Sequence, residues 1–221
     1  MRLWQRTLLT MLGTPNRDRV AERRSATRQE IVDAAWDVAR EQGLAQLTLR
    51  DVAARVGMKA PSLYSHVNSK NGIYDAMFAQ AWTQCRELML AAEARRPPDA
   101  RGALRLYARA FFDFSVSDLA RFQLMNQRTI PGFEPSREAY EQAVLTLGVL
   151  RDLLARHAIT AQEDIDLYVA LVGGLADAQL ANDPGGDRWS RLLDRAIDMY
   201  LHDLAIETEV EPTSTHEGDR P

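Results

Sequence analysis

The chain has 221 residues, of which 46% are hydrophobic and 26% charged, and these proportions are ordinary for a water-soluble globular protein. A single cysteine, Cys85, excludes a disulfide framework and a cysteine-based zinc site, and it suits a reducing cytoplasm. The net charge of −4 conceals a basic front, since residues 1–75 hold 12 Lys+Arg against 8 Asp+Glu while the remainder holds 15 against 23.

Residues 1–24 precede the first clear helical pattern and are expected to form a flexible arm. The opening MRLWQRTLLTML is followed by no small-residue cleavage site, and no later run reaches the roughly 18 apolar residues of a membrane span, so we expect a cytoplasmic protein with no membrane partner. The arginines around residue 20 predict either a basic arm that lies along DNA phosphates or a solvated tail; they are Arg17, Arg19, Arg23, Arg24 and Arg28.

Apolar residues recur at helical spacing along the chain and strand alternation is almost absent, so an all-α fold is predicted. In the first part, Thr48 and Asp51 form a capping-box pattern, Gly57 ends the helix that follows, and Pro61 suits the first position of the next one. Ser69 is expected to cap a fourth, long helix. The helices predicted here cover about 27–42, 49–56, a short stretch from about 60, and 70–94.

The sequence Arg95–Asp99, RRPPD, is the clearest break in the helical pattern and starts the second part. Five further helices are predicted at roughly 100–116, 118–127, 134–157, 161–181 and 187–205. The last residues, 206–221, are polar and acidic and are expected to be a disordered tail.

The stretch VGMKAPSLYSHV, residues 56–67, has only Leu63 and Val67 as large apolar anchors and would make a poor core helix. A helix-turn-helix gives such a helix a role, because its inward residues rest on the two preceding helices while its polar residues enter the DNA major groove. The alternative is a solvated connector between two core helices. The absence of acidic residues between Val52 and Tyr74, and the caps on both sides, favour the helix-turn-helix.

Residues 25–78 resemble the DNA-binding domain of the TetR-type transcriptional regulators. The resemblance rests on an Ile-x-x-Ala-Ala opening helix, Gly43, Thr-Leu-x-x-Val-Ala from Thr48, Val-Gly at 56–57, Leu-Tyr-x-His from Leu63, and Ser-Lys at 69–70. It implies a three-helix DNA-binding domain at 25–72 and a helical ligand-binding and dimerisation domain at 73–205. It also implies base contacts from Lys59, Ala60, Pro61 and Ser62, and phosphate contacts from Thr48, Tyr64, His66 and Lys70.

Aromatic and apolar residues concentrate between Tyr107 and Met125. Such a concentration is typical of plain core, and the resemblance adds the alternative of a cavity that holds an apolar or aromatic effector. The residues expected to line this cavity are Trp82, Cys85, Met89, Tyr107, Phe111, Phe114, Phe122, Met125, Tyr140 and Tyr168.

The last two predicted helices are expected to form the face of a homodimer, as a four-helix bundle with the second copy. Gly173–Gly174 would let helices approach closely, and no strand precedes them as a nucleotide loop would require. The matching apolar stripe on the last helix is Trp189, Leu192, Leu193, Ala196, Ile197 and Tyr200.

Together these patterns predict a ligand-responsive transcriptional regulator, most often a repressor in the resembled family, which leaves a palindromic double-stranded operator when its effector binds. One alternative is a DNA-binding dimer without an effector. A second is an all-α enzyme, which the scattered histidines and the lack of H-E-x-x-H and G-x-S-x-G motifs argue against. We therefore expect no catalytic residue, no metal site and no cofactor.

Overall fold

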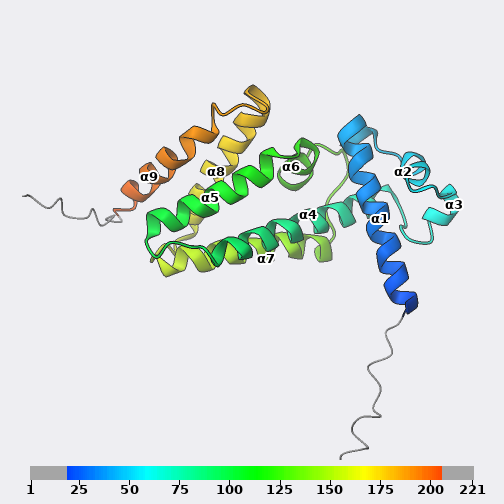
Figure 1. The fold of residues 1–221 in the computed structure, drawn as a ribbon, viewed down its shortest axis with the longest axis horizontal. Helices are drawn as coiled ribbons and strands as arrows, with labels where there is room; N and C mark the ends of the chain where they lie inside the picture. Colours follow the sequence, from blue (N-terminus) through cyan, green and yellow to red (C-terminus); the bar gives the residue numbers. More distant parts are fainter. Residues whose placement is uncertain (1–18, 206–221) are drawn as a thin grey trace, which may run out of the picture. The chain divides into compact units, whose positions relative to one another are not determined.

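The computed structural model describes residues 19–205, and the secondary structure of these residues is entirely helical, with no strand among them (Figure 1). The prediction of an all-α fold is confirmed. The predictions for residues 1–18 of the arm and for the tail at 206–221 lie outside the described residues. The elements are α1 (Arg19–Gln42), the 3-10 helix η1 (Leu44–Gln46), α2 (Leu49–Val56), α3 (Ala60–Leu63), α4 (Lys70–Glu93), α5 (Ala100–Val116), α6 (Leu119–Asn126), α7 (Arg137–Arg156), α8 (Gln162–Asn182), the 3-10 helix η2 (Ser190–Leu192) and α9 (Leu193–Asp203).

The chain forms two compact units. The first contains the described residues up to Met77 together with Thr129–Phe133, and the second contains Phe78–Arg128 and the residues from Glu134 onwards. The sequence-based division falls after residue 72 and assigns 129–133 to the second domain. The short return segment belongs to the first unit because the Phe133 ring packs on the Tyr74 ring, with 5.3 Å between centroids.

Helix α1 begins at Arg19, about eight residues before the predicted start at Thr27. Residues 19–24, assigned to a flexible arm, are therefore its first turns. Apolar periodicity could not reveal them, because the residues ahead of Ile31 are almost all exposed and carry no buried stripe. Arg24 donates to the backbone carbonyl of Ser65 at 3.4 Å, so this arginine has a protein partner within the first unit.

Helix α2 begins and ends where its caps predict. The Thr48 hydroxyl accepts the backbone N–H of Asp51 at 3.2 Å and donates to the Asp51 carboxylate at 2.6 Å, so the acid reaches the threonine side chain. Gly57 takes the left-handed conformation with φ of 73°, and its N–H bonds α2 carbonyls. Val52 and Ala53 are buried and hold α2 in the core of the first unit.

Helix α3 is shorter than its flanking residues suggest. It covers only Ala60–Leu63, and the chain continues in turns as far as His66. Leu63 and Val67 are both buried, at 0% and 3% exposure, as predicted for the two anchors of this segment. Their i, i+4 spacing mimics a longer helix, but the second anchor is reached through a turn.

Helix α4 begins at the predicted cap, since the Gly72 N–H donates to Ser69 Oγ at 3.0 Å. Its first turn is fastened to η1 by two side chains. The Tyr74 hydroxyl donates to the Leu44 carbonyl at 2.5 Å, and Lys70 Nζ donates to the Ala45 carbonyl at 2.9 Å. Burial raises the pKa of Tyr74 to about 12, so the phenol keeps the proton that it donates.

The core of the second unit is built around α5. This helix packs against α6, α7, α8 and α9, and in Figure 1 it runs between the α8–α9 pair and the α4–α7 pair. Its Leu104, Tyr107 and Phe112 are almost completely buried. A helix that is apolar on more than one side is required here, because neighbours cover it on several sides.

Helix α9 corrects the predicted dimer face. Most of its proposed stripe is buried within this chain: Leu193, Ala196, Ile197 and Tyr200 are at most 9% exposed. The reason is that α9 packs on α5, where Arg105 forms an ion pair with Asp198 at 2.5 Å. These four residues therefore belong to the core of the second unit and cannot also face a second copy.

Candidate functional site

The segment around α3 presents an exposed polar surface in the first unit. Lys59, Pro61 and Ser62 are exposed, and Ala60 is half-buried. Tyr64 is 54% exposed although it is one of the larger aromatic residues of the unit, and it follows α3 directly. A hydroxyl, a phenol and an ammonium group thus lie within six consecutive residues without a core role.

The turn after α3 is held by its own hydrogen bonds. Ser65 Oγ donates to the Ser62 carbonyl at 2.7 Å, and the N–H groups of His66 and Val67 bond the Leu63 carbonyl at 2.9 and 3.1 Å. His66 Nδ1 is buried, and no acceptor or donor among the described residues pairs with it. His66 and Tyr64 therefore project from a structured turn and not from a helix.

Two of the residues expected to contact phosphate have partners inside the protein. Thr48 caps α2, and the ammonium of Lys70 both donates to Ala45 and lies 5.6 Å above the Tyr74 ring. The Thr48 bond fixes the start of α2, and the Lys70 bond holds the start of α4 against η1. A phosphate contact from Lys70 would use the remaining N–H groups of its ammonium.

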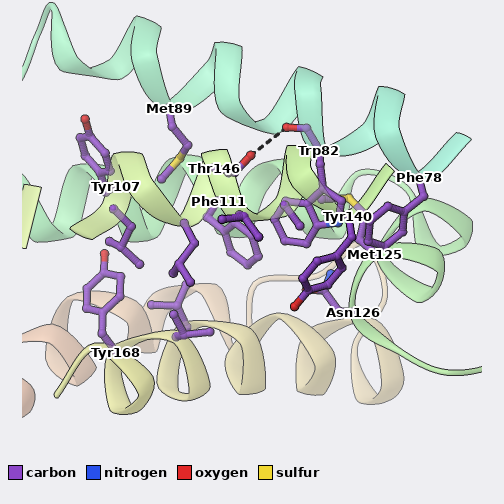
Figure 2. A pocket seen from close by; sticks show the side chains of 16 residues that line it. Phe78, Trp82, Met89, Tyr107, Phe111, Met125, Asn126, Tyr140, Thr146 and Tyr168 are labelled. Carbon is purple, nitrogen blue, oxygen red and sulfur yellow. Dashed lines mark hydrogen bonds between the residues drawn. The ribbon is translucent and has the colours of Figure 1, made fainter. Parts of the chain in front are cut away.

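A cavity of about 280 Å³ lies within the second unit (Figure 2). No charged side chain of the described residues lines it. In Figure 2, Phe78, Trp82, Met125, Asn126 and Tyr140 gather at one end, whereas Tyr107 and Tyr168 lie at the other. The lining residues are Phe78, Trp82, Met89, Tyr107, Phe111, Met125, Asn126, Tyr140, Ala143, Val144, Thr146, Leu147, Leu150, Tyr168, Val169 and Val172.

The structure brings most of the predicted lining residues together at this cavity: Trp82, Met89, Tyr107, Phe111, Met125, Tyr140 and Tyr168. The other three lie elsewhere in the unit. Cys85 is fully buried in the packing of α4, and burial raises the pKa of its thiol to about 12. Phe114 lies under the Arg121 guanidinium, 3.7 Å from the ring centroid, and Phe122 is buried in α6.

Sequence reasoning found only Tyr140 among the six α7 residues that line the cavity. Each of the six lies three or four residues from another member of the set, which places them on one side of the helix. That spacing is visible in the sequence and could have revealed the set, but it is also the spacing of ordinary core. The α7 residues are Tyr140, Ala143, Val144, Thr146, Leu147 and Leu150.

Most hydroxyl groups at the cavity already have protein partners. The Tyr107 hydroxyl donates to Glu93 Oε2 at 2.6 Å, and the Tyr168 hydroxyl donates to the Leu104 carbonyl at 2.8 Å. Thr146 Oγ1 lies 2.8 Å from the Gln142 carbonyl. Burial raises the pKa of both tyrosines, so they remain neutral donors at physiological pH.

Glu93 forms the centre of a charged network behind Tyr107. Its carboxylate accepts the Tyr107 hydroxyl, the Arg156 guanidinium and Arg96 Nε, the last at 3.0 Å. The pKa of Glu93 falls to about 2, first because of the Tyr107 hydrogen bond and then because of the two arginines, which together outweigh its partial burial. The network joins the ends of α4 and α7 to α5.

We expect Glu93→Gln to lower the free energy of unfolding at neutral pH and to make that free energy depend less on pH in acid. The folded pKa of Glu93 is below the unfolded value of 4.5, so its stabilisation is present above about pH 4.5 and is lost as the pH falls towards 2. The free energy of unfolding is measured in urea from pH 7 to pH 3. The values for Glu93→Gln and the wild type should differ most at pH 7 and converge as the pH falls. Glu87→Gln, an exposed position on the same helix, is the control; equal pH slopes for Glu93→Gln and the wild type would contradict the assignment.

Other classes of site find no support in residues 19–205. No group of three or more histidine, cysteine, aspartate or glutamate side chains there is arranged to hold a metal ion. None of the helices over the same residues combines the length and the apolar character needed to cross a membrane.

Comparison with known proteins identifies residues 31–77 as a match to the family described as bacterial regulatory proteins, tetR family. The HTH-type transcriptional regulator YobS from Bacillus subtilis is 27% identical over 92 residues, which cover 42% of this chain and 47% of YobS. The HTH-type transcriptional repressor BepR from Brucella suis is 25% identical over 175 residues, which cover 73% of this chain and 84% of BepR. Across the first curated relatives that it matches, the chain spans about half of their length or less.

Among solved structures, the fold is similar to that of the transcriptional regulator FadR from Bacillus subtilis in complex with stearoyl-CoA. The TM-score is 0.61 at 17% identity, and the match covers 78% of this chain and 96% of FadR. At this identity the likeness concerns the fold. It extends over both units, beyond the residues of the family match.

Proposed function

The chain belongs to the TetR family through residues 31–77, and on this premise we propose that it is a cytoplasmic, homodimeric transcriptional repressor that releases its operator when a small apolar or aromatic effector binds. One observation carries the proposal: a family-matched unit with an exposed polar segment at α3 occurs in the same chain as a unit with an apolar cavity. Neither feature calls for catalysis, so no enzymatic role is proposed.

For DNA, we place the segment from Lys59 to Tyr64 in the major groove. Lys59 and Ser62 supply donors for base edges or phosphates, and Ala60 and Pro61 supply apolar contacts for thymine methyl groups. Tyr64 is exposed and directly follows α3, a position that suits a contact with a phosphate. Thr48, His66 and Lys70 are the remaining phosphate candidates, and all three are held in place by the first unit.

For the effector, the cavity favours a molecule with an apolar body. The FadR structure contains stearoyl-CoA, which combines an apolar chain with charged phosphates. No charged side chain of the described residues lines the cavity here, so an ionised group inside it would find no partner. We therefore propose an uncharged effector.

For the dimer, we propose that α8 and α9 form the interface, but through residues other than the predicted stripe. Leu167 on α8 and Met199 on α9 are 46% and 63% exposed and do not line the cavity, so they remain available to a second copy. A Cβ atom added at Gly173 or Gly174 would meet no other atom within 4 Å. Another helix therefore has room to approach closely there. Two copies would present two α3 segments to a palindrome, and an effector with different affinity for two arrangements of the dimer would shift operator occupancy.

The proposal is tested on the intergenic DNA beside the gene with the purified full-length chain. We expect a footprint over a palindrome, a steep loss of affinity as salt rises, and half-sites about one helical turn apart, since two helix-turn-helix segments of a dimer bind successive major grooves. A small-molecule screen should then find a compound that lowers operator affinity. If the protein binds no palindrome in this DNA or in a selection from random sequences, the proposed role as a regulator is refuted. If it binds an operator but no compound alters the affinity, only the proposed effector response is refuted.

A further inference from the structure

The indole of Trp82 carries a buried hydrogen-bond donor that the fold does not use. Trp82 is on α4 and lines the cavity, and its ring packs beside Phe78 with 6.2 Å between centroids. Its Nε1 is buried from solvent, and no acceptor among residues 19–205 bonds it. A buried N–H without an acceptor costs free energy, so a partner supplied from outside the fold would be favoured.

This donor differs from three hydroxyl groups at the cavity, which already have protein partners. The hydroxyls of Tyr107, Tyr168 and Thr146 already bond protein oxygen atoms, and an effector would gain from them only by breaking those bonds. Trp82 therefore places a buried donor without a partner in the wall of the cavity, among mostly apolar side chains. Figure 2 shows Trp82 at the end where Asn126 and Tyr140 also lie.

The lining of the cavity extends along two helices. On α4 it runs from Phe78 to Met89, and on α7 from Tyr140 to Leu150, which correspond to about 15–17 Å along each helix axis. An elongated molecule can therefore contact side chains at both ends of the lining.

We propose that the effector is an elongated, uncharged molecule whose hydrogen-bond acceptor, such as a carbonyl oxygen, binds Trp82 Nε1 after a small rotation of the indole, while its apolar body extends towards Tyr107 and Tyr168. This inference rests on the proposed function and specifies the ligand class of its cavity. An acceptor at this position satisfies the buried N–H, which a pure hydrocarbon leaves unpaired. A carboxylate would also accept, but it brings a charge that nothing in the lining neutralises.

The test compares matched probes that differ in the acceptor. The pairs are 2-nonanone with nonane and 4-phenylbutan-2-one with butylbenzene, and nonanoate serves as the charged analogue; dissociation constants are measured by calorimetry on the full-length dimer. We expect each ketone to bind roughly tenfold more tightly than its hydrocarbon. Nonanoate is expected to bind more weakly than 2-nonanone.

Trp82→Phe keeps an aromatic ring and removes the donor, so it should abolish the preference for ketones while hydrocarbon binding persists. Trp189→Phe is the matched control, because Trp189 Nε1 is also buried without a partner but does not line the cavity; its preference for ketones should equal that of the wild type. A ketone preference that survives in Trp82→Phe, equal binding of each pair by the wild type, or no binding of any probe would overturn the inference. Operator affinity is measured in parallel, and ketone binding that leaves it unchanged would refute the effector response without refuting the site.

Discussion

The double variant Lys59→Ala/Tyr64→Ala is expected to lose operator affinity by about 100-fold while its thermal stability stays within the error of the measurement. Both side chains are exposed, so neither supports the core. A side-chain interaction with phosphate or base is typically worth about 1–3 kcal/mol, and the effects of removing two of them at distinct sites add. Fluorescence anisotropy with the footprinted operator measures the affinity, and the slope of log affinity against log salt should fall by about one when the lysine is removed.

Tyr64→Phe separates the phenol hydroxyl from the ring. If the hydroxyl bonds a phosphate, this variant should lose part of the affinity that Tyr64→Ala loses, without any change in the salt slope. Leu90→Ala is a surface control, because Leu90 is similarly exposed at 52% but lies on the α4 portion of the second unit. Full operator affinity in the Lys59→Ala/Tyr64→Ala chain would mean that DNA binds a different surface.

Leu63→Ala is expected to destabilise the first unit by about 3 kcal/mol and to abolish operator binding without altering any groove-facing group. Leu63 is completely buried, and truncation of a buried leucine typically costs about 2–5 kcal/mol. Helix α3 has four residues, far too few to persist without packing, so the loss of one of its two anchors should release the segment. Hydrogen exchange should rise between Met58 and Val67.

Helix α5 provides the internal control for this variant. It lies in the second unit, and its exchange rates and the binding of 2-nonanone should equal those of the wild type if the damage is local. Leu90→Ala again controls for a leucine truncated at the surface. Retained operator binding by Leu63→Ala would show that the order of α3 does not depend on its packing.

Helix boundaries were predictable wherever a side chain caps a backbone group or a glycine ends a helix. Thr48, Gly57 and Ser69 each do so in the structure, and the chemistry of such caps is local. The start of α1 had no such signal, because its first turns are exposed and bury no stripe. The end of α3 had no such signal either, because the turn that follows it places Val67 where a longer helix would also have placed it.

The cavity was predictable in its composition and not in its outline. Apolar side chains within one helix differ in which neighbour they meet, and that depends on the rotation of each helix in the packed unit. Phe111 lines the cavity, whereas Phe114, three residues later, lies under Arg121. The predicted dimer stripe was wrong for the same reason, because an amphipathic helix shows that one face is buried without showing whether its own chain or a second copy buries it.

The hydrogen bond from Lys70 to the Ala45 carbonyl has a practical consequence for labelling. The sequence contains two lysines, and this one is half-buried, bonded and stacked on Tyr74, whereas Lys59 is exposed at the start of α3. Apart from the α-amino group, an amine-reactive dye used in limiting amount should therefore attach chiefly at Lys59. A fluorophore could thus be placed beside the proposed DNA-reading segment without engineering a new residue into the chain.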